Sequence, residues 1–245
     1  MIHKKYFILY FLLFVSSISQ AQTAKEIYKK YMDAIGGEDN FKAINSLKIE
    51  ENSKNFNAET DKSIRYKKRK DLFRAEYYED SSTYGCSCYD GKFFWRLGKK
   101  STKPKNVSRS QNEDKSWTID DEAGGEPLFN SLIEYQSYGN TIHLEESIEE
   151  DDKAYFVIRV TLKKLSSTDF YINKATYLLD KTVEISQSGD KGVMTFISDY
   201  RQVGNLLLPH KRVSHLMGHI FSTTMVDNIT LNPEISDELF KCERK

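Results

Sequence analysis

The sequence contains few cysteines and no excess of charge of one sign. Cys86 and Cys88 are two residues apart and would share a face of a strand, but two ligands do not make a structural zinc site, which takes four. The 36 basic and 36 acidic residues balance, so no strong long-range field attracts nucleic acid. These shortages argue against a metal-stabilised domain and against a DNA-binding protein.

The sequence also lacks the motifs of common enzyme classes. It contains no Gly-x-Ser-x-Gly elbow, no phosphate-cradling glycine loop and no His-Glu-x-x-His. His210, His215 and His219 are the nearest candidates for a metal-dependent hydrolase, but Pro209 and its neighbours favour strands over the helix that would align them. The acidic run 149–152 lies between two predicted strands and indicates a solvated turn. We therefore expect no enzyme, no metal and no cofactor.

One long apolar run is present, at the start of the chain. Lys4 and Lys5 precede the apolar residues Tyr6–Ile18, and Ser19-Gln20-Ala21 supplies a small-residue cleavage site. This order is typical of a secretory signal peptide, and the run of about 13 residues is shorter than the ~18–20 needed to span a bilayer. We predict cleavage after Ala21. Residues 22–245 would then form one soluble domain, with a net charge of 34 − 36 = −2.

Export also bears on the cysteines. An exported protein meets oxidising conditions, so Cys242 can form a disulfide with Cys86 or with Cys88. The sequence leaves both pairings and the free thiols open.

The mature sequence changes from a helical to a strand pattern. Apolar residues at three- and four-residue spacing predict an amphipathic helix that ends at Gly36-Gly37, followed by a short helix at 41–44. From Leu47 onward, short β-branched and aromatic runs are separated by turn residues, among them the hairpin signal Asp90-Gly91. This pattern predicts a mainly β domain, formed by an antiparallel barrel or a strongly curved sheet.

A long polar stretch, residues 98–125, interrupts the strands. Pro127 then begins a predicted helix, and the apolar residues of that helix are Leu128, Phe129, Leu132, Ile133 and Tyr135. Loops of this length in compact domains are often functional lids. We interpret the segment as a helical lid, with disorder of the loop as the alternative.

The most specific pattern lies between residues 68 and 95. It begins with Lys68-Arg69-Lys70-Asp71-Leu72-Phe73 and ends with Asp90-Gly91-Lys92-Phe93-Phe94-Trp95. These stretches resemble the Lys-Arg-Pro-Asn-x-Phe segment and the Asp-Gly-Lys-x-x-Trp hairpin of the LolA-like periplasmic carriers, which sort lipoproteins to the outer membrane. Lys70 and Asp71 depart from the family's proline and asparagine. The N-terminal helix and the tail 232–240 extend the resemblance over nearly the whole mature chain.

The resemblance implies a fold and a function. The fold would be a single antiparallel, incompletely closed β-barrel of about 10–11 strands with an N-terminal helix and a helical lid. Its apolar cavity would carry the acyl chains of a lipoprotein or lipid through the periplasm, from an inner-membrane donor to an outer-membrane acceptor, as a monomer. Arg69 matches the family's functional arginine. The candidate residues lining the acyl cavity are Arg69, Leu72, Phe93, Trp95, Leu128 and Leu132.

Physical chemistry adds one constraint. Each buried methylene contributes ~0.8 kcal/mol, so two chains of about 15 methylenes would nominally reach roughly 24 kcal/mol, beyond the ~18–21 of the tightest complexes. A carrier therefore has to shield its cargo incompletely and open its lid. The alternative is a structural or regulatory domain, lipid-sensing or with a filled core, that has no role in transport.

Overall fold

The computed structural model describes most of the chain after the predicted signal peptide, which lies outside the described residues. The described ranges are 22–56, 60–69, 72–79, 82–91, 94–97, 105–106, 131–133, 135–137, 139–161 and 167–241. Within them, no helix combines the length and the apolar character needed to cross a bilayer.

The described strands form one antiparallel sheet of fourteen strands. They are β1 (Ser46–Asn55), β2 (Thr60–Lys68), β3 (Leu72–Glu79), β4 (Ser82–Tyr89), β5 (Phe94–Leu97), β6 (Lys105–Asn106), β7 (Thr141–Leu144), β8 (Ile148–Glu150), β9 (Lys153–Thr161), β10 (Ser167–Asn173), β11 (Leu179–Ile185), β12 (Lys191–Val203), β13 (Leu206–Leu216) and β14 (His219–Leu231). The mainly β prediction is confirmed. The structure has more strands than the 10–11 expected, because strands as short as β6 and β8 are too brief to show a sequence period.

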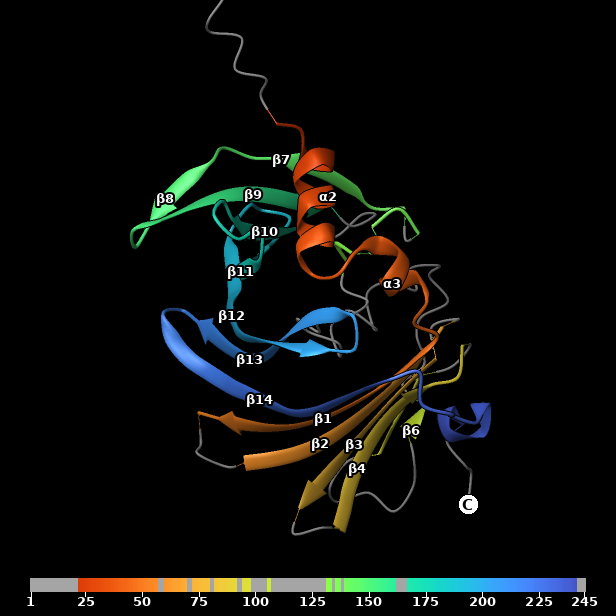
Figure 1. The fold of residues 1–245 in the computed structure, drawn as a ribbon. Coiled ribbons are helices and arrows are strands. Elements are labelled where there is room, and N and C mark those ends of the chain that lie inside the picture. Colours follow the sequence, from red (N-terminus) through yellow and green to blue (C-terminus); the bar gives the residue numbers. More distant parts are fainter. Residues whose placement is uncertain are drawn as a thin grey trace, which may run out of the picture.

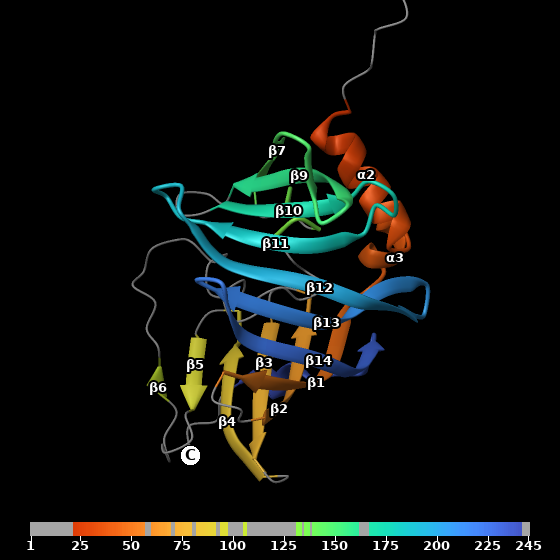
Figure 2. The same ribbon diagram turned by 90° about the vertical axis from the view of Figure 1, so that its left-hand side faces the viewer.

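The sheet curls strongly but does not close. Its strand order is β6-β5-β4-β3-β2-β1-β14-β13-β12-β11-β10-β9-β7, with β8 on β9. The terminal strands β6 and β7 lie at opposite ends of this order, so the barrel is incomplete, as predicted (Figures 1 and 2). Each wing is a meander of neighbouring strands. The first strand of the chain joins the wings by pairing with the last, from Leu47↔Leu231 to Asn55↔Ser222.

The amphipathic N-terminal helix, α2 (Ala24–Ala34), forms as the sequence predicts. Thr23 and Glu26 make a capping box, in which each side chain accepts a hydrogen bond from the other residue's backbone N–H. The buried face of the helix consists of Ile27, Tyr31 and Met32. The short helix α3 covers Glu38–Lys42, a few residues before the predicted 41–44. Acidic residues favour a helix N-terminus, and Glu38-Asp39 provide them here.

Both helices lie on the concave side of the sheet (Figure 1). The main core forms between them and the strands, and Leu47 and Ile49 of β1 belong to it. Side chains alternate between the faces of a strand, so residues in register with Leu47 and Ile49 share the concave face. The other buried members of this core are Ile27, Tyr31, Met32, Ile35, Phe41, Ile44, Leu132, Ile133, Ile158, Val160, Phe170, Ile172, Leu179, Ile197, Leu206, Leu208, Val226 and Ile229.

The described part of the predicted lid packs against α2 but is not helical. Residues 131–133 and 135–137 form turns, and the earlier part of the predicted helix lies outside the described residues. Leu132 is completely buried. The Tyr28 hydroxyl donates to the Ile133 carbonyl at 2.9 Å, and its ring meets Tyr135 edge-on at 5.2 Å between centroids. The described part of the segment is thus attached to α2 and to the main core.

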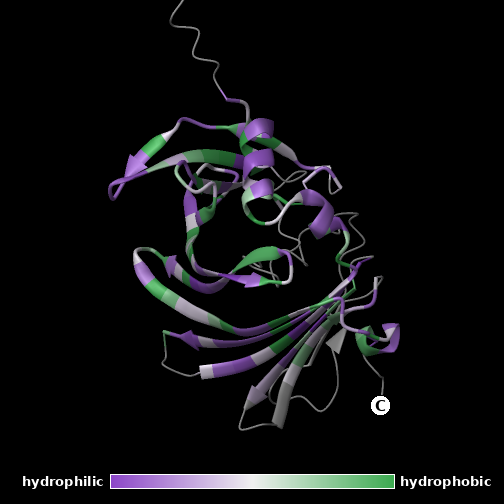
Figure 3. Cartoon of the chain, in the orientation of Figure 1, coloured by the Kyte–Doolittle hydropathy of each residue, from purple (hydrophilic) through white to green (hydrophobic). Residues whose placement is uncertain are grey.

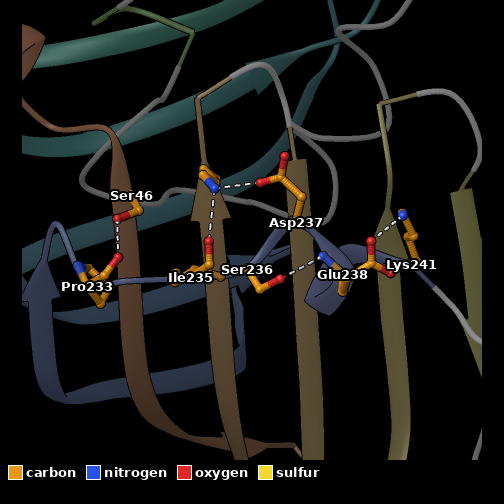
Figure 4. A network of polar contacts seen from close by, with 8 residues as sticks. Ser46, Pro233, Ile235, Ser236, Asp237, Glu238 and Lys241 are labelled. Atoms are coloured by element: carbon orange, nitrogen blue, oxygen red, sulfur yellow. Dashed lines mark hydrogen bonds and ion pairs between the residues drawn. The ribbon is translucent and has the colours of Figure 1, made fainter.

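The C-terminal segment covers the opposite, convex face of β2 and β3. It ends in the 3-10 helix η1 (Asp237–Phe240), whose Phe240 is fully buried. Figure 4 shows the polar contacts: Ser46 Oγ donates to the Pro233 carbonyl at 2.6 Å, and Lys68 Nζ donates to the Ile235 carbonyl at 2.9 Å and to Asp237. The tail, which the sequence resemblance included, is thus part of the folded domain.

Gly36 lies between α2 and α3, close to the start of β13, and a substitution there tests this arrangement. Its φ of +118° suits glycine, and an added Cβ would lie 2.3 Å from the Asn205 carbonyl oxygen. We expect Gly36→Ala to lower the free energy of unfolding by about 2–3 kcal/mol more than Gly37→Ala. Gly37 also has a positive φ, +90°, but meets nothing within 4 Å. Urea denaturation of both variants measures the difference, and equal losses would show that the close approach is absent.

Candidate functional site

The concave face beside the main core carries a buried cluster of charges centred on Glu51. This carboxylate of β1 is completely buried. Arg65 Nε of β2 lies 2.8 Å from Glu51 Oε1, and Arg212 Nη2 of β13 donates to Glu51 Oε2 at 2.7 Å. The Ser63 hydroxyl donates to the same carboxylate at 3.3 Å. Glu51, Arg65, Arg212 and Ser63 are called the Glu51 cluster below.

The backbone register explains why these charges meet inside the sheet. Residues 47, 49 and 51 alternate on one face of β1, so the face that carries Leu47 and Ile49 into the core also carries Glu51. Arg65 lies opposite Ile49, and Ser63 lies opposite Glu51. On the other side of β1, strand β14 separates it from β13, and Arg212 reaches across that strand.

The arginines keep Glu51 ionised. Burial by itself raises the pKa of a carboxyl group. Here the nearby Arg65 and Arg212 guanidinium groups, together with the Arg212 and Ser63 hydrogen bonds, outweigh burial and lower the pKa of Glu51. A buried carboxylate held between two arginines is a fixed charge pattern rather than a proton donor, since it stays deprotonated at neutral pH.

An aromatic cluster continues the concave face next to these charges. Phe73, Ala75 and Tyr89 are buried together, with Tyr77 packed against them. Phe73 lies opposite Lys67 in the β2–β3 pairing, and Ala75 lies opposite Arg65. Lys67 is also buried, with its Nζ 6.0 Å from the centroid of the Phe73 ring. This part of the concave face is therefore amphiphilic, with aromatic rings beside cationic and anionic groups.

Arg69 occupies a different place, at the junction of the sheet and the helices. Its Nε donates to the Ile44 carbonyl at 2.6 Å, and its Nη2 donates to the Phe41 carbonyl at 3.0 Å. Its backbone N–H donates to the Asn45 carbonyl at 2.8 Å. A guanidinium group near the last carbonyls of a helix is favourable because those carbonyls are partly negative. Arg69 thus attaches the end of β2 to the segment that follows α3.

The other predicted cavity residues, where the structure describes them, lie in different parts of the fold. Leu72 begins β3, is half-buried, and lies on the face opposite Phe73, which is the face that η1 covers. Leu132 is buried in the main core against α2. Trp95 belongs to β5, where its backbone pairs with Cys88. Phe93 and Leu128 lie outside the described residues, as does Cys242.

The histidines are spread along β13 and its hairpin. His210 is buried, with Nδ1 2.9 Å from the Leu208 carbonyl oxygen, whereas the ring of His215 packs edge-on against Phe196. These two histidines are five residues apart, about 17 Å at the rise of a strand. His219 is exposed at the start of β14. Across the described residues, no group of three His, Cys, Asp or Glu side chains is arranged to hold a metal ion.

The sequence reasoning missed the Glu51 cluster, although a signal for it was present. Leu47, Ile49 and Glu51 have the period of a strand, as do Leu206, Leu208, His210 and Arg212. In each run a charged residue lies at a position where the alternation predicts an apolar residue. Charges of opposite sign on the apolar faces of two strands indicate a buried ion pair.

Comparison with known proteins places the fold but not the activity. No protein-family model matches the chain, and no curated protein matches it. A LolA superfamily protein from Nitrosomonas europaea has a TM-score of 0.61 and 14% identity over 91% of this chain and 99% of that chain. A DUF1329 family protein from Desulfovibrio piger has a TM-score of 0.64 and 12% identity over 90% and 98% of the two chains.

A third solved structure has a similar fold. It is a Vibrio parahaemolyticus domain described as an outer membrane lipoprotein-sorting protein, with a TM-score of 0.57 and 12% identity over 88% of this chain and 94% of that chain. All three structures resemble this chain over most of both lengths. The LolA-like fold predicted from residues 68–95 is therefore confirmed.

Substitution of Glu51 tests the buried cluster. We expect Glu51→Gln to lower the free energy of unfolding at pH 7 by about 3–5 kcal/mol, because it removes the negative charge between two guanidinium groups. The folded-state pKa is lowered, so this contribution is present above the ordinary Glu pKa of about 4.3. It is lost as the pH falls through the folded-state value. Urea denaturation between pH 7 and pH 3 measures both effects.

The matched control is Glu50→Gln. Glu50 is the next residue of β1, lies on the other face, and pairs with Lys48 where both side chains are partly exposed. Its loss should be about 1 kcal/mol or less. Equal losses in the two variants, or a Glu51→Gln loss that stays constant down to pH 3, would contradict the buried ion-pair cluster.

Proposed function

We propose that the protein is an exported, chaperone-like carrier that binds the acyl chains of a lipoprotein or lipid in the periplasm and takes part in sorting to the outer membrane. One observation carries the proposal: an unclosed LolA-like sheet whose concave face places an aromatic cluster beside buried charges. Binding and release of such a cargo need no catalytic step. We therefore propose a role that is not enzymatic.

The amphiphilic concave face suits an amphiphilic cargo. Acyl chains gain by leaving water at ~0.8 kcal/mol per methylene. The Phe73, Tyr77 and Tyr89 rings form an apolar cluster on the concave face, in which Tyr77 is only partly buried. Lys67, Arg65 and Ser63 lie on β2, the strand next to the one that carries Phe73 and Tyr77. Arg65, whose side chain is 15% exposed, can contact the polar head that joins the chains. A ligand with both parts matches this face better than a pure hydrocarbon does.

Arg69 gives the carrier a means of controlling its cover. The helices α2 and α3 lie over the concave side, and Arg69 attaches the end of α3 to the sheet through two side-chain hydrogen bonds. Hydrogen bonds from a charged group contribute about 1.5–3 kcal/mol each. The attachment is thus strong enough to hold the cover in place and weak enough to be exchanged when cargo enters or leaves.

A second candidate function is a structural or lipid-sensing interaction domain with no role in transport. The extent of the main core favours it, because buried side chains fill the concave side beneath α2. In this case the aromatic cluster is packing, and the buried charges specify the fold. The carrier and a structural domain differ in whether the protein holds a ligand in stoichiometric amount, whereas a lipid sensor would hold a ligand without transferring it.

Native mass spectrometry of the mature protein, purified from the periplasm of its own host, tests the proposal. We expect a one-to-one adduct with the mass of a lipid or an acylated peptide. Arg69→Leu should weaken the adduct, since it releases the cover from the sheet. Arg201→Leu is the matched control, because Arg201 is an exposed residue paired with Asp199. It should leave the adduct unchanged.

Thermal melting of both variants separates weaker binding from unfolding. A protein that remains free of adduct, even after incubation with lipid or lipoprotein without detergent, would contradict carriage and favour the interaction domain. Such an interaction domain should show no lipid or acylated-peptide adduct in any variant.

A further inference from the structure

Large apolar side chains are exposed at one end of the sheet. They lie on the β13–β14 hairpin, on the adjacent strand β12 and on the turn after β1, and are Phe56, Phe196, Leu216, Met217, Ile220, Phe221 and Met225. The hairpin and the end of β1 lie on the same side of the molecule, at the left of Figure 1, and the hairpin end is coloured as hydrophobic in Figure 3. Phe56, Leu216, Met217, Ile220 and Phe221 are called the apolar tip below.

Met217 lies in a tight, exposed turn, where neither its apolar side chain nor its backbone conformation is common. Met217 and Gly218 form the two-residue turn of the hairpin, with φ of +50° and +80°. Two positive φ values define a type I′ turn, in which Asn, Asp or Gly is normal at the first position. The Met217 side chain is 89% exposed. Neither turn geometry nor burial in this chain accounts for an apolar residue there.

Other residues with positive φ show that this position is exceptional. Among the described residues, six that are not glycine have a positive φ, and four of these are Asp or Asn, which tolerate it. Tyr177 is the fifth. Its hydroxyl accepts a hydrogen bond from Lys30, and its ring stacks on Phe156. Met217 is not buried in this way. Its unfavourable backbone conformation and exposed apolar side chain therefore indicate that it contacts something outside the protein.

The apolar tip is held together by backbone hydrogen bonds. The Phe56 N–H donates to the Phe221 carbonyl at 3.1 Å, which joins the β1 turn to the hairpin. Strands β13 and β14 pair up to Leu216↔His219, directly at the turn. Backbone groups that are already paired can enter a medium of low polarity without a large penalty. These paired groups lower the penalty for contact between the apolar tip and lipid.

The charges on the hairpin itself suit an anionic surface, and the neighbouring turn at the start of β12 carries one charge of each sign, Asp190 and Lys191. From Lys211 through Val226 the hairpin contains no acidic residue. Its ionisable side chains are Lys211, Arg212, His215 and His219, and of these Arg212 belongs to the Glu51 cluster. Lys54 is exposed two residues before Phe56. Asp61, across the β1–β2 pairing, accepts a hydrogen bond from Asn55 at 3.2 Å.

We infer that the apolar tip docks the protein on an anionic lipid bilayer, with Met217, Ile220 and Phe56 entering the interfacial region. The apolar tip consists of five side chains at the end of β1 and on the β13–β14 hairpin. Protein interfaces need a broader complementary surface, about 800 Å² per partner. Apolar side chains with basic neighbours are the combination that binds anionic membrane surfaces. The inference goes beyond the proposed function, because docking requires no bound cargo.

Co-sedimentation of the mature protein with vesicles tests the inference. We expect binding to phosphatidylglycerol–phosphatidylcholine vesicles and weaker binding to phosphatidylcholine alone. Met217→Asn is the decisive variant, because asparagine suits the first position of a type I′ turn and removes the apolar side chain. We expect unchanged or higher thermal stability, and vesicle affinity reduced on the order of tenfold when Ile220→Ser is combined with it.

Met217→Leu is the matched control, since it keeps an apolar side chain in the same turn, and it should bind vesicles as the wild type does. Absence of wild-type binding, or full binding by the Met217→Asn/Ile220→Ser variant, would overturn the inference. Self-association in analytical ultracentrifugation that this double variant abolishes, without vesicle binding, would assign the surface to a second copy and overturn it as well. The cargo adduct in native mass spectrometry should persist in the double variant, so failure of docking and failure of carriage are distinguishable.

Discussion

The pairing of the first strand with the last is the constraint on which the rest of the structure depends. Strands β1 and β14 pair along their length, and this ladder joins two meanders that otherwise have no common strand. Closing so long a loop is slow and entropically unfavourable, so the ladder has to be supported by the core that Leu47, Ile49, Val226 and Ile229 build with α2. The same ladder brings Glu51 within reach of Arg212, which is 161 residues away in the chain.

The Glu51 cluster represents a compromise between stability and specificity. Well-packed apolar residues often stabilise a core as well as a buried ion pair does, whereas removing one partner of such a pair is strongly destabilising. Three ionisable groups contributed by β1, β2 and β13 therefore act against other registers of these strands, because a slip by one residue would move the charge to the other face. The same fixed charges beside Phe73 and Tyr89 make the concave face suitable for a ligand with a polar head. One arrangement can serve both purposes, since neither requires the charges to move.

The hairpin of β13 and β14 links the two surfaces proposed to act on lipid. Arg212 lies on the concave side of β13, and Met217 lies at the turn five residues further along the chain. The hairpin is paired from Lys211 to its turn, with one bulge after Ser214, and so connects the concave side to the apolar tip. A protein docked through its apolar tip would thus present its concave face at a defined height above a membrane. This geometry suits a molecule that exchanges cargo with a bilayer, and it suits equally a sensor that reads lipid at the surface.

The sequence by itself predicted an export signal. It also determined the change from helices to strands after Ile44 and the LolA-like resemblance. These features are local, since periodicity, turn residues and short motifs are read within a few residues of one another. Only the tertiary structure decided that Arg69 donates to the Phe41 and Ile44 carbonyls. It likewise decided that Leu72 faces away from Phe73 and that Glu51 meets Arg65 and Arg212. It also decided that Phe56 and Met217, far apart in the chain, belong to one exposed end. The reason is physical: strand register and sheet order set these proximities, and they arise from pairing between distant segments, of which a local pattern carries no record.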